Sequence, residues 1–357
     1  MRIIHTSDLH IGAPFSSKLS PEKIRIRKAE LLDNFRRLCD EAQMIKADAV
    51  IIAGDLFDSE NVSLSVCRQI ISCMESAMPV SFIYLPGNHE KNAFTECGLN
   101  MPENLKIFTR DKLFYDLGEV TVYGICEIGQ GALDGFSPDA CRRNILVLHG
   151  ALSEGRSTAD GEIGTEDLKN KGLDYVALGH YHSYCARKID KRCNAVYSGT
   201  PEGRGYDETG EKGYVVIDVD SAGVSHTFKA FARRTVRIAE VYTEEITGRS
   251  ELDARAAAEL SGIPRGDLVR LVFKGKRSPE LVIDTAAFMA RWSESFFHFE
   301  AKDETAVKIN PKDYAADKSL KGEFIRLVSA RDDLTEEEKG QIISCGINAL
   351  IKEFYEV

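Results

Sequence analysis

The chain has 357 residues, 43% of them hydrophobic and 29% charged, which is typical of a globular protein with one large core and a smaller second unit. Its formal charge of −10 argues against charge-driven wrapping of nucleic acid, although divalent metals can invert the charge of a local site. Nine cysteines without a CxxC pair, and no signal-like or membrane-length apolar segment, predict reduced thiols and a cytoplasmic protein without membrane spans.

The first apolar segment, residues 2–6, has the length of a buried strand and runs into Ser-Asp-Leu-His. Residues i and i+2 of extended backbone point to the same side, so Asp8 and His10 can converge on one ion. A hard oxygen beside an imidazole at a strand end indicates a metal site.

The pattern turns helical over residues 21–43, with apolar positions along one side. The start of this helix is basic and includes Arg25 and Arg27. Two interpretations stay open for these arginines: a solvated helix face, or a surface near the first motif that contacts substrate phosphates.

A second buried strand ends in a carboxylate. Residues 49–53 form an apolar run that stops at Gly54 and Asp55. The glycine permits a sharp turn, which places the Asp55 side chain beyond the carboxyl end of the strand, where open α/β sheets bind ligands. An aspartate that only caps the next turn is the alternative.

A third strand follows a predicted helix at 63–76. This strand, residues 80–85, breaks at a proline into Gly-Asn-His-Glu, residues 87–90. Asn88 offers an oxygen ligand. His89 is its neighbour at a turn, so its side chain should diverge and have a different task.

The next strands are assigned to a second sheet and cover residues 121–125, 144–148 and 175–178. The middle strand ends at His149, and the last runs into Gly-His-Tyr-His, so His180 and His182 repeat the i, i+2 spacing. Five of the eight histidines therefore lie at strand ends beside Asp or Asn, which packing alone does not explain.

Strands at 195–197 and 214–219 flank a loop, residues 198–208, that contains three glycines. Glycines permit close approach of backbone to a ligand, and Arg204 in this loop can clamp a phosphate. An exposed arginine on a tight turn is the equally open alternative.

Composition changes after residue 232, and we place domains at 1–235, 236–310 and 311–357. The middle segment predicts a small α/β unit, and Thr335 with Glu338 predicts a capping box that opens a final amphipathic helix. The helices and strands expected after residue 232 are a helix at 250–261, a strand at 267–273, a helix at 279–292, a strand at 296–307, and a last helix with Ile342, Ile343, Leu350 and Phe354 on its apolar side.

The candidate ligands comprise three oxygen donors and four imidazoles, with no thiolate: Asp8, His10, Asp55, Asn88, His149, His180 and His182. Seven ligands suffice for two divalent ions if Asp55 bridges them. This set suits Mn²⁺, Fe²⁺ or Zn²⁺ better than Ca²⁺, while Mg²⁺ prefers oxygen alone. Two ions about 3.5–4 Å apart suit displacement at phosphorus.

One catalytic task remains, which is to protonate or stabilise the leaving alkoxide. His89 lies next to a ligand in the sequence and is the candidate for it, with Glu90 expected to orient its ring.

These motifs, in this order, resemble the calcineurin-like metallophosphoesterases. The resemblance rests on Asp8-x-His10, Gly54-Asp55-x-x-Asp58, Gly87-Asn88-His89-Glu90, His149-Gly150 and Gly179-His180-x-His182. It implies an αββα sandwich of two sheets, with a smaller C-terminal α/β cap domain and a terminal helix. It also implies that Asp55 is shared by two metals, with Asp58 supporting the loop. One metal would be bound by Asp8, His10, Asp55 and His182, and the other by Asp55, Asn88, His149 and His180.

Within that superfamily the chain is most similar to the SbcD-type DNA repair exonucleases, through HTSDLHIG, GDLFD and GNHE. This likeness implies Mn²⁺-dependent cleavage of DNA, a homodimer, and an SMC-like ABC ATPase partner. A phosphodiesterase or phosphatase for small nucleotides is the second hypothesis. A catalytically silent scaffold is the third, and it is disfavoured because no candidate ligand is missing.

Overall fold

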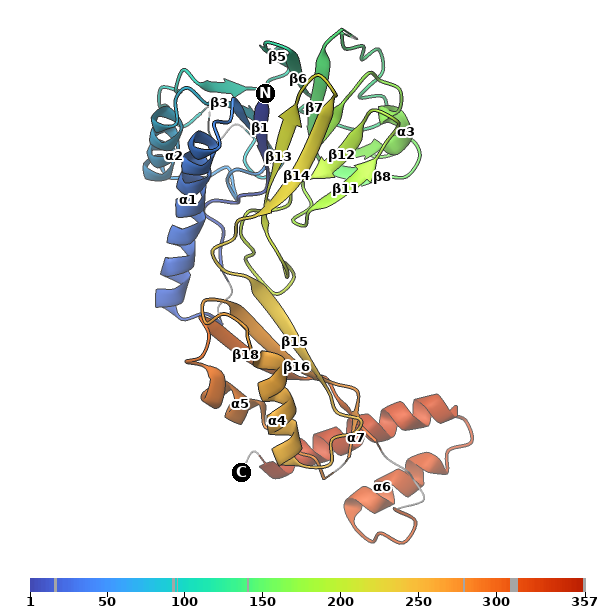
Figure 1. Ribbon diagram of the computed structural model, residues 1–357. Helices are drawn as coiled ribbons and strands as arrows, with labels where there is room; N and C mark the ends of the chain where they lie inside the picture. Colours follow the sequence, from blue (N-terminus) through green and yellow to red (C-terminus); the bar gives the residue numbers. More distant parts are fainter. Residues whose placement is uncertain are drawn as a thin grey trace. The chain divides into compact units, whose positions relative to one another are not determined.

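The computed structural model describes residues 1–15, 18–91, 94, 96–139, 141–278, 280–308 and 314–355 (Figure 1). The chain folds into two compact units, Met1–Val236 and Arg237–Val357. The predicted division of the second part at residue 310 stays a prediction. Within the described ranges, no helix is long and apolar enough to cross a membrane.

The first unit is built on a six-stranded sheet whose central strands are parallel. Hydrogen bonding gives the order β14-β13-β1-β2-β3-β4, in which β13 and β14 pair antiparallel at one edge. The uninterrupted apolar run AVIIA, residues 49–53, fits a central strand that is covered on both faces. The strands are β1 (Arg2–Thr6), β2 (Ala49–Ala53), β3 (Ser81–Leu85), β4 (Leu105–Ile107), β13 (Gly213–Val219) and β14 (Val224–Ala230).

A second six-stranded sheet has the order β11-β12-β10-β7-β6-β5, with parallel pairing from β6 through β12. At its two edges, β5 pairs antiparallel with β6 and β11 pairs antiparallel with β12. The predicted sandwich of two sheets is therefore confirmed. The strands are β5 (Phe114–Leu117), β6 (Val120–Gly124), β7 (Arg143–His149), β10 (Tyr175–Gly179), β11 (Cys185–Lys188) and β12 (Asn194–Tyr197).

Successive side chains of each strand point to opposite faces of the sheet, so the core is divided into layers. Ile51 and Ile83 of the first sheet face Val147 and other residues of the second sheet, and all are fully buried. The opposite face of the first sheet packs on helices α1 (Pro21–Met44) and α2 (Leu64–Ser76).

The outer face of the second sheet is covered differently. One short helix, α3 (Thr165–Leu168), and a two-stranded ribbon, β8 (Ala151–Ser153) with β9 (Glu162–Gly164), contribute to its cover together with loops. These short elements were not predicted, because none is long enough to show a hydrophobic period.

The second unit contains a three-stranded sheet of order β15-β16-β18, packed on two helices. The capping box of Thr335 and Glu338 is confirmed at the start of the last helix. The bounds are β15 (Val236–Tyr242), α4 (Arg249–Leu260), β16 (Leu268–Lys274), β17 (Lys276–Arg277), α5 (Thr285–Trp292), β18 (His298–Asp303), β19 (Ala306–Val307), α6 (Leu320–Ser329) and α7 (Glu336–Tyr355).

Two expectations for this unit need correction. The predicted helix at 279–292 starts only at α5, because Asp284 caps it by accepting a hydrogen bond from the Ala287 amide. The tail holds α6 as well as α7, and they pack through Ile325 and Ile343, whereas Ile342 is exposed. The side chains of Leu350 and Phe354 lie outside the described residues.

A buried ionic network ties α1 to the loop after β12. Arg27 is fully buried and contacts Glu202 and Glu30, each at 2.7 Å. Glu202 is also fully buried and accepts hydrogen bonds from the Asn34 side chain and the Arg233 amide. Every carboxylate oxygen of Glu30 and Glu202 has a partner, so removing one member of the network would leave a buried charge poorly compensated.

Replacing Glu202 should test how strongly this network holds the first unit. Glu202→Ala leaves the Arg27 guanidinium with one anion fewer, so urea unfolding followed by circular dichroism should show a loss of about 3 kcal/mol. The control Glu60→Ala breaks an exposed pair with Lys91 and should cost less than about 1 kcal/mol. Equal losses would mean that the buried network adds no special stability.

Candidate metal centre

The candidate ligands gather at the edge where the parallel strands of both sheets end. Adjacent strands end in register, as the pairing of Ala53 with Leu85 and of His149 with Gly179 shows. Four of the ligands have positive φ: 52° at Asp8, 44° at His10, 51° at Asp55 and 102° at His180. Such backbone is rare outside glycine and concentrates at functional sites.

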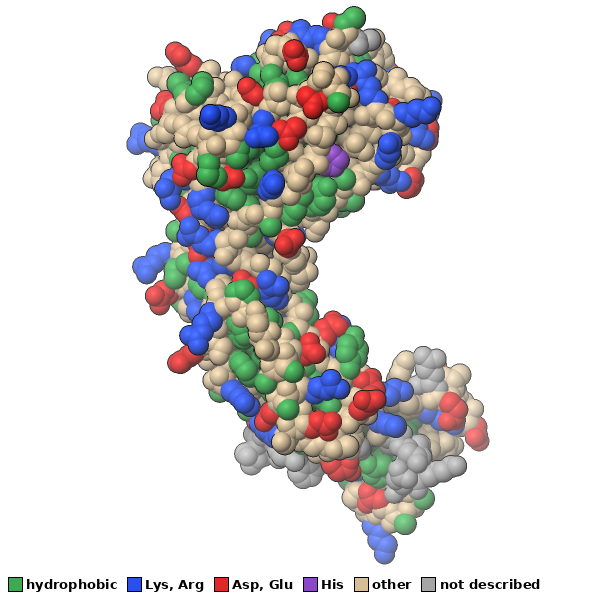
Figure 2. Space-filling view, viewed as in Figure 1, with side chains coloured by type: hydrophobic (Ala, Val, Ile, Leu, Met, Phe, Trp, Pro, Cys, Tyr) green, Lys and Arg blue, Asp and Glu red, His purple; other side chains and the backbone are tan. Residues whose placement is uncertain are grey.

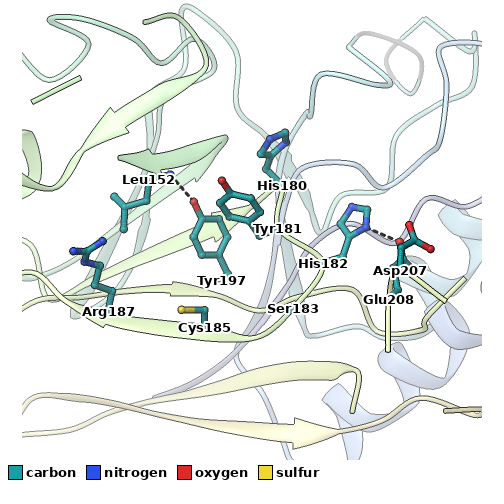
Figure 3. Close-up of a pocket in the computed structure, with 10 residues that line it drawn as sticks. All are labelled: Leu152, His180, Tyr181, His182, Ser183, Cys185, Arg187, Tyr197, Asp207 and Glu208. Atoms are coloured by element: carbon teal, nitrogen blue, oxygen red, sulfur yellow. Dashed lines mark hydrogen bonds and ion pairs between the residues drawn. The ribbon is translucent and has the colours of Figure 1, made fainter. Parts of the chain in front are cut away.

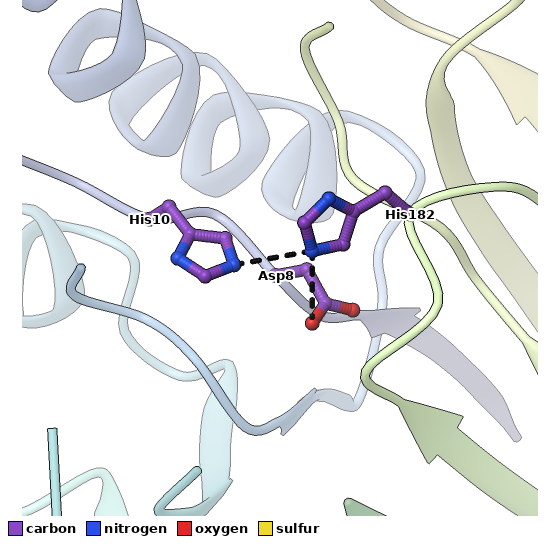
Figure 4. A group of neighbouring side chains, drawn as sticks. All are labelled: Asp8, His10 and His182. Atoms are coloured by element: carbon purple, nitrogen blue, oxygen red, sulfur yellow. Dashed lines mark hydrogen bonds and ion pairs between the residues drawn. The ribbon is translucent and has the colours of Figure 1, made fainter. Parts of the chain in front are cut away.

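One group consists of Asp8, His10 and His182 (Figure 4). The Nε2 atoms of His10 and His182 lie 3.2 Å apart, and His182 Nε2 lies 3.8 Å from Asp8 Oδ1. Asp8 also accepts a hydrogen bond from the His180 amide at 3.0 Å, which joins the first motif to the last.

A second group forms around Asp55. Its Oδ2 lies 3.3 Å from His149 Nε2 and 3.6 Å from His10 Nε2, so this carboxylate stands between the two groups. Asn88 Oδ1 lies 2.9 Å from the same His149 nitrogen. The His180 ring is 5.6 Å from the His149 ring, centre to centre. The structure thus brings together all seven predicted ligands.

The outer ring nitrogens explain why the inner ones face each other. Nδ1 of His149 lies 2.9 Å from the Ala53 carbonyl oxygen, which can only accept, so Nδ1 carries the proton. Nδ1 of His10 and of His182 faces a carboxylate in the same way, Asp58 at 3.1 Å and Glu208 at 2.6 Å. The Nε2 lone pairs then point inward at carboxylate oxygens, which is the donor arrangement of a metal site.

The electrostatics agree with this assignment. Burial, with Arg204 nearby, lowers the pKa of His10 to about 3, which keeps its ring neutral and able to bind a cation. Burial also opposes charge on His149, but the Asp55 carboxylate prevails and raises the pKa of His149 to about 9, so at neutral pH its Nε2 carries a proton that a bound cation would displace. The site therefore attracts positive charge between Asp55 and Asn88.

Two glycines make the close approach possible. A Cβ at Gly87 would stand 2.0 Å from Asp55 Oδ1, and one at Gly54 would stand 2.1 Å from His149 Nδ1. Gly54 also has a φ of 87°, which favours glycine. These motif glycines therefore leave the room that the ligands occupy.

A family model described as calcineurin-like phosphoesterase matches residues 1–184, about half of the chain. The chain belongs to the calcineurin-like phosphoesterase family. Members are hydrolases with a binuclear divalent metal centre, and the donor set above fits such a centre.

Relatives of this phosphoesterase include an uncharacterized metallophosphoesterase, YhaO, of Bacillus subtilis, which is 27% identical over 331 residues, covering 86% of this chain and 80% of the relative. The DNA double-strand break repair protein Mre11 of Methanosarcina acetivorans is 28% identical over 253 residues, covering 66% of this chain and 39% of that protein. Mre11 of Sulfurisphaera tokodaii is 28% identical over 240 residues, covering 61% and 59%. The chain therefore spans less than two thirds of either Mre11 protein.

Among solved structures, the protein TT1561 of Thermus thermophilus is similar with a TM-score of 0.41 and 12% identity, over 64% of this chain and 98% of that chain.

Glu90 has a different role from the expected one. It accepts hydrogen bonds from the Tyr84 hydroxyl at 2.6 Å, the Gly87 amide at 2.9 Å and the Phe57 amide at 2.6 Å. The expectation that it orients His89 is wrong, because the Asp58 carbonyl oxygen lies 3.1 Å from His89 Nδ1 instead. Glu90 is a buried side chain that connects the loops after β2 and β3 by hydrogen bonds.

The structure places the three predicted substrate-binding arginines differently. Arg25 is exposed on α1. Arg204 lies beside the metal centre, where its guanidinium pairs with Asp58 at 3.3 Å and Glu208 at 2.8 Å. Arg27 as a phosphate contact needs correction, because its side chain is fully buried in the network with Glu202.

Glu208 was not among the predicted site residues. This residue closes the glycine-containing loop, and its carboxylate holds both His182 and Arg204. Burial opposes its charge, but these two partners lower its pKa well below the usual range. The only sequence signal was its place at the end of a loop already chosen for Arg204.

Glu208→Gln should weaken divalent-metal binding, measured with Mn²⁺ as the probe, by about 10- to 100-fold, because an amide orients and polarises the His182 ring less well than a carboxylate. Isothermal titration calorimetry measures this affinity. Glu211→Gln makes the same change at an exposed position three residues away and should leave the affinity unchanged. If both variants weaken binding equally, general loss of negative charge is the cause.

Proposed function

We propose that this phosphoesterase is a Mn²⁺-dependent phosphodiesterase that cleaves DNA as a repair exonuclease. The observation that carries the proposal is the set of three imidazoles whose outer nitrogens are held by Asp58, Glu208 and Ala53, so that the inner nitrogens converge on Asp8 and Asp55. These residues would hold two divalent ions, which would lower the pKa of a water and neutralise phosphate oxygens.

We assign the ligands to two ions that share Asp55. Asp8, His10, Asp55 and His182 would hold one ion, and Asp55, Asn88, His149 and His180 would hold the other. Mn²⁺ is the proposed metal because imidazole and carboxylate donors are mixed without a thiolate; Fe²⁺, Zn²⁺ and Mg²⁺ are the alternatives.

His89 is the proposed general acid. Its Nδ1 faces the Asp58 carbonyl oxygen, and its Nε2 lies 3.9 Å from Asp55 Oδ2 at the border of the cluster. The side chain is 44% exposed, so it can reach a substrate in solution. As an imidazolium it would give the Nε2 proton to the leaving alkoxide.

The choice of DNA draws on the relatives. The Mre11 proteins are DNA double-strand break repair proteins by name, and they match this chain over about two thirds of its length. Over the first unit, the visible face in Figure 2 shows Lys and Arg side chains interspersed with Asp and Glu side chains. We therefore propose that an SMC-like ABC ATPase supplies part of the DNA-binding surface, that residues 236–310 form a cap, and that the chain is a homodimer.

A substrate panel tests the proposal. With Mn²⁺, the protein should release nucleotides from linear DNA, and the same preparation should be inactive after chelation. Asp55→Ala removes the shared carboxylate, so metal content by mass spectrometry and nuclease activity should fall together. Turnover confined to cyclic nucleotides or p-nitrophenyl esters would favour the small-nucleotide hypothesis instead.

His89→Asn should keep both metal ions and lower kcat by about 10²- to 10⁴-fold, since the variant cannot deliver a proton to the leaving group. The loss should shrink with a p-nitrophenyl ester, because that leaving group departs without protonation. Unchanged kcat on DNA would remove His89 from the reaction.

A further inference from the structure

A cavity of about 520 Å³ adjoins the metal centre (Figure 3). His180 and His182 form part of its wall, and Tyr181, Tyr197, Leu152 and Cys185 line it as well. This volume lies in the range of small-molecule sites. The cavity therefore joins the predicted ligand imidazoles to aromatic and apolar side chains, and Arg187, Asp207 and Glu208 line it too.

Tyr181 is an exposed aromatic residue in the wall of this cavity. It lies between two predicted ligands in the chain, and the residue is 49% exposed. Its ring stands 5.5 Å from the His180 ring and 4.8 Å from the Tyr197 ring, centre to centre. An aromatic ring in this place is thus one side chain away from the metal centre.

Tyr197 packs against the Tyr181 ring. It is buried, its hydroxyl donates to the Gly150 carbonyl oxygen at 2.9 Å, and it accepts a hydrogen bond from the Leu152 amide at 2.7 Å. The two rings meet edge to face at 69°. Tyr181 is therefore supported by a fixed neighbour while much of its own surface stays open to the cavity.

The geometry points to Tyr181 as the platform on which a nucleobase stacks when the adjoining phosphate lies at the metal centre. This inference rests on the proposed phosphodiesterase function and adds that the substrate carries a base next to the scissile phosphate. Every base has a flat face that stacks on an aromatic ring, so the site would accept different bases. The end of a DNA strand and a free nucleotide ester share this chemistry.

The test compares two esters that share a leaving group, thymidine 5′-(p-nitrophenyl phosphate) and methyl p-nitrophenyl phosphate, with the full chain and Mn²⁺. The measured quantity is the ratio of their kcat/KM values. Tyr181→Ala should lower this ratio by about 5- to 150-fold, the range of base–aromatic stacking. Tyr181→Phe keeps the ring and should keep the ratio.

Tyr184→Ala is the matched control. Tyr184 is also exposed and near in sequence, but its ring packs on Phe228, so its loss should not change the ratio. If Tyr181→Ala fails to fold or to bind Mn²⁺, Tyr181→Leu serves in its place, because leucine can still pack on Tyr197 without a flat face. An unchanged ratio in the folded, metal-loaded variant would overturn the inference.

A second arm identifies the source of the base. Single-stranded oligonucleotides ending in thymidine or in an abasic tetrahydrofuran nucleotide are compared under the same conditions. If Tyr181→Ala lowers kcat/KM for the thymidine-ended oligonucleotide more than for the abasic one, as well as for the thymidine ester, the platform serves DNA ends. If only the value for the thymidine ester falls, the platform serves free nucleotides. If the unmodified protein cleaves neither ester nor oligonucleotide, the proposed function fails first and this inference with it.

Discussion

Lone pairs and negative oxygens face one another where the strands of this phosphoesterase end, and such an arrangement is stable only with positive charge between them. His10 and His182 bring their Nε2 atoms to 3.2 Å, and Asp55 stands between His10 and His149. The outer carboxylates and the Ala53 carbonyl oxygen fix this orientation from behind. The Asp55 carboxylate also raises the pKa of His149 to about 9, so a proton on this ring can supply the positive charge that a bound metal ion would otherwise supply.

The fold serves this constraint by bringing distant residues to one edge. Parallel strands of two sheets end there, and the hydrogen bond from the His180 amide to Asp8 links residues 172 positions apart. Glu90 joins the loops after β2 and β3, while Glu208 joins His182 to Arg204. Buried carboxylates outside the ligand set thus determine how accurately the ligands meet.

Much of this site could be predicted because each ligand follows a strand whose apolar run is visible in the sequence. The supporting residues could not be predicted, since the contact of Glu208 with His182 depends on how a loop folds. Arg27 shows a different limit. Its spacing puts it on the same helix face as Leu31 and Leu38, which predicts a buried side chain, whereas its charge predicts an exposed one. The partner that makes burial tolerable, Glu202, is 175 residues away.

The positive φ angles at Asp8, His10, Asp55 and His180 set stability against activity in this protein. Each strained residue costs about 1–3 kcal/mol, and glycine or asparagine at these positions would relax the backbone. The same exchanges would remove a carboxylate or an imidazole from the centre. A search for heat-resistant variants would therefore be drawn to the positions where improvement in folding abolishes chemistry, a trade-off confined here to the few residues that follow the strands.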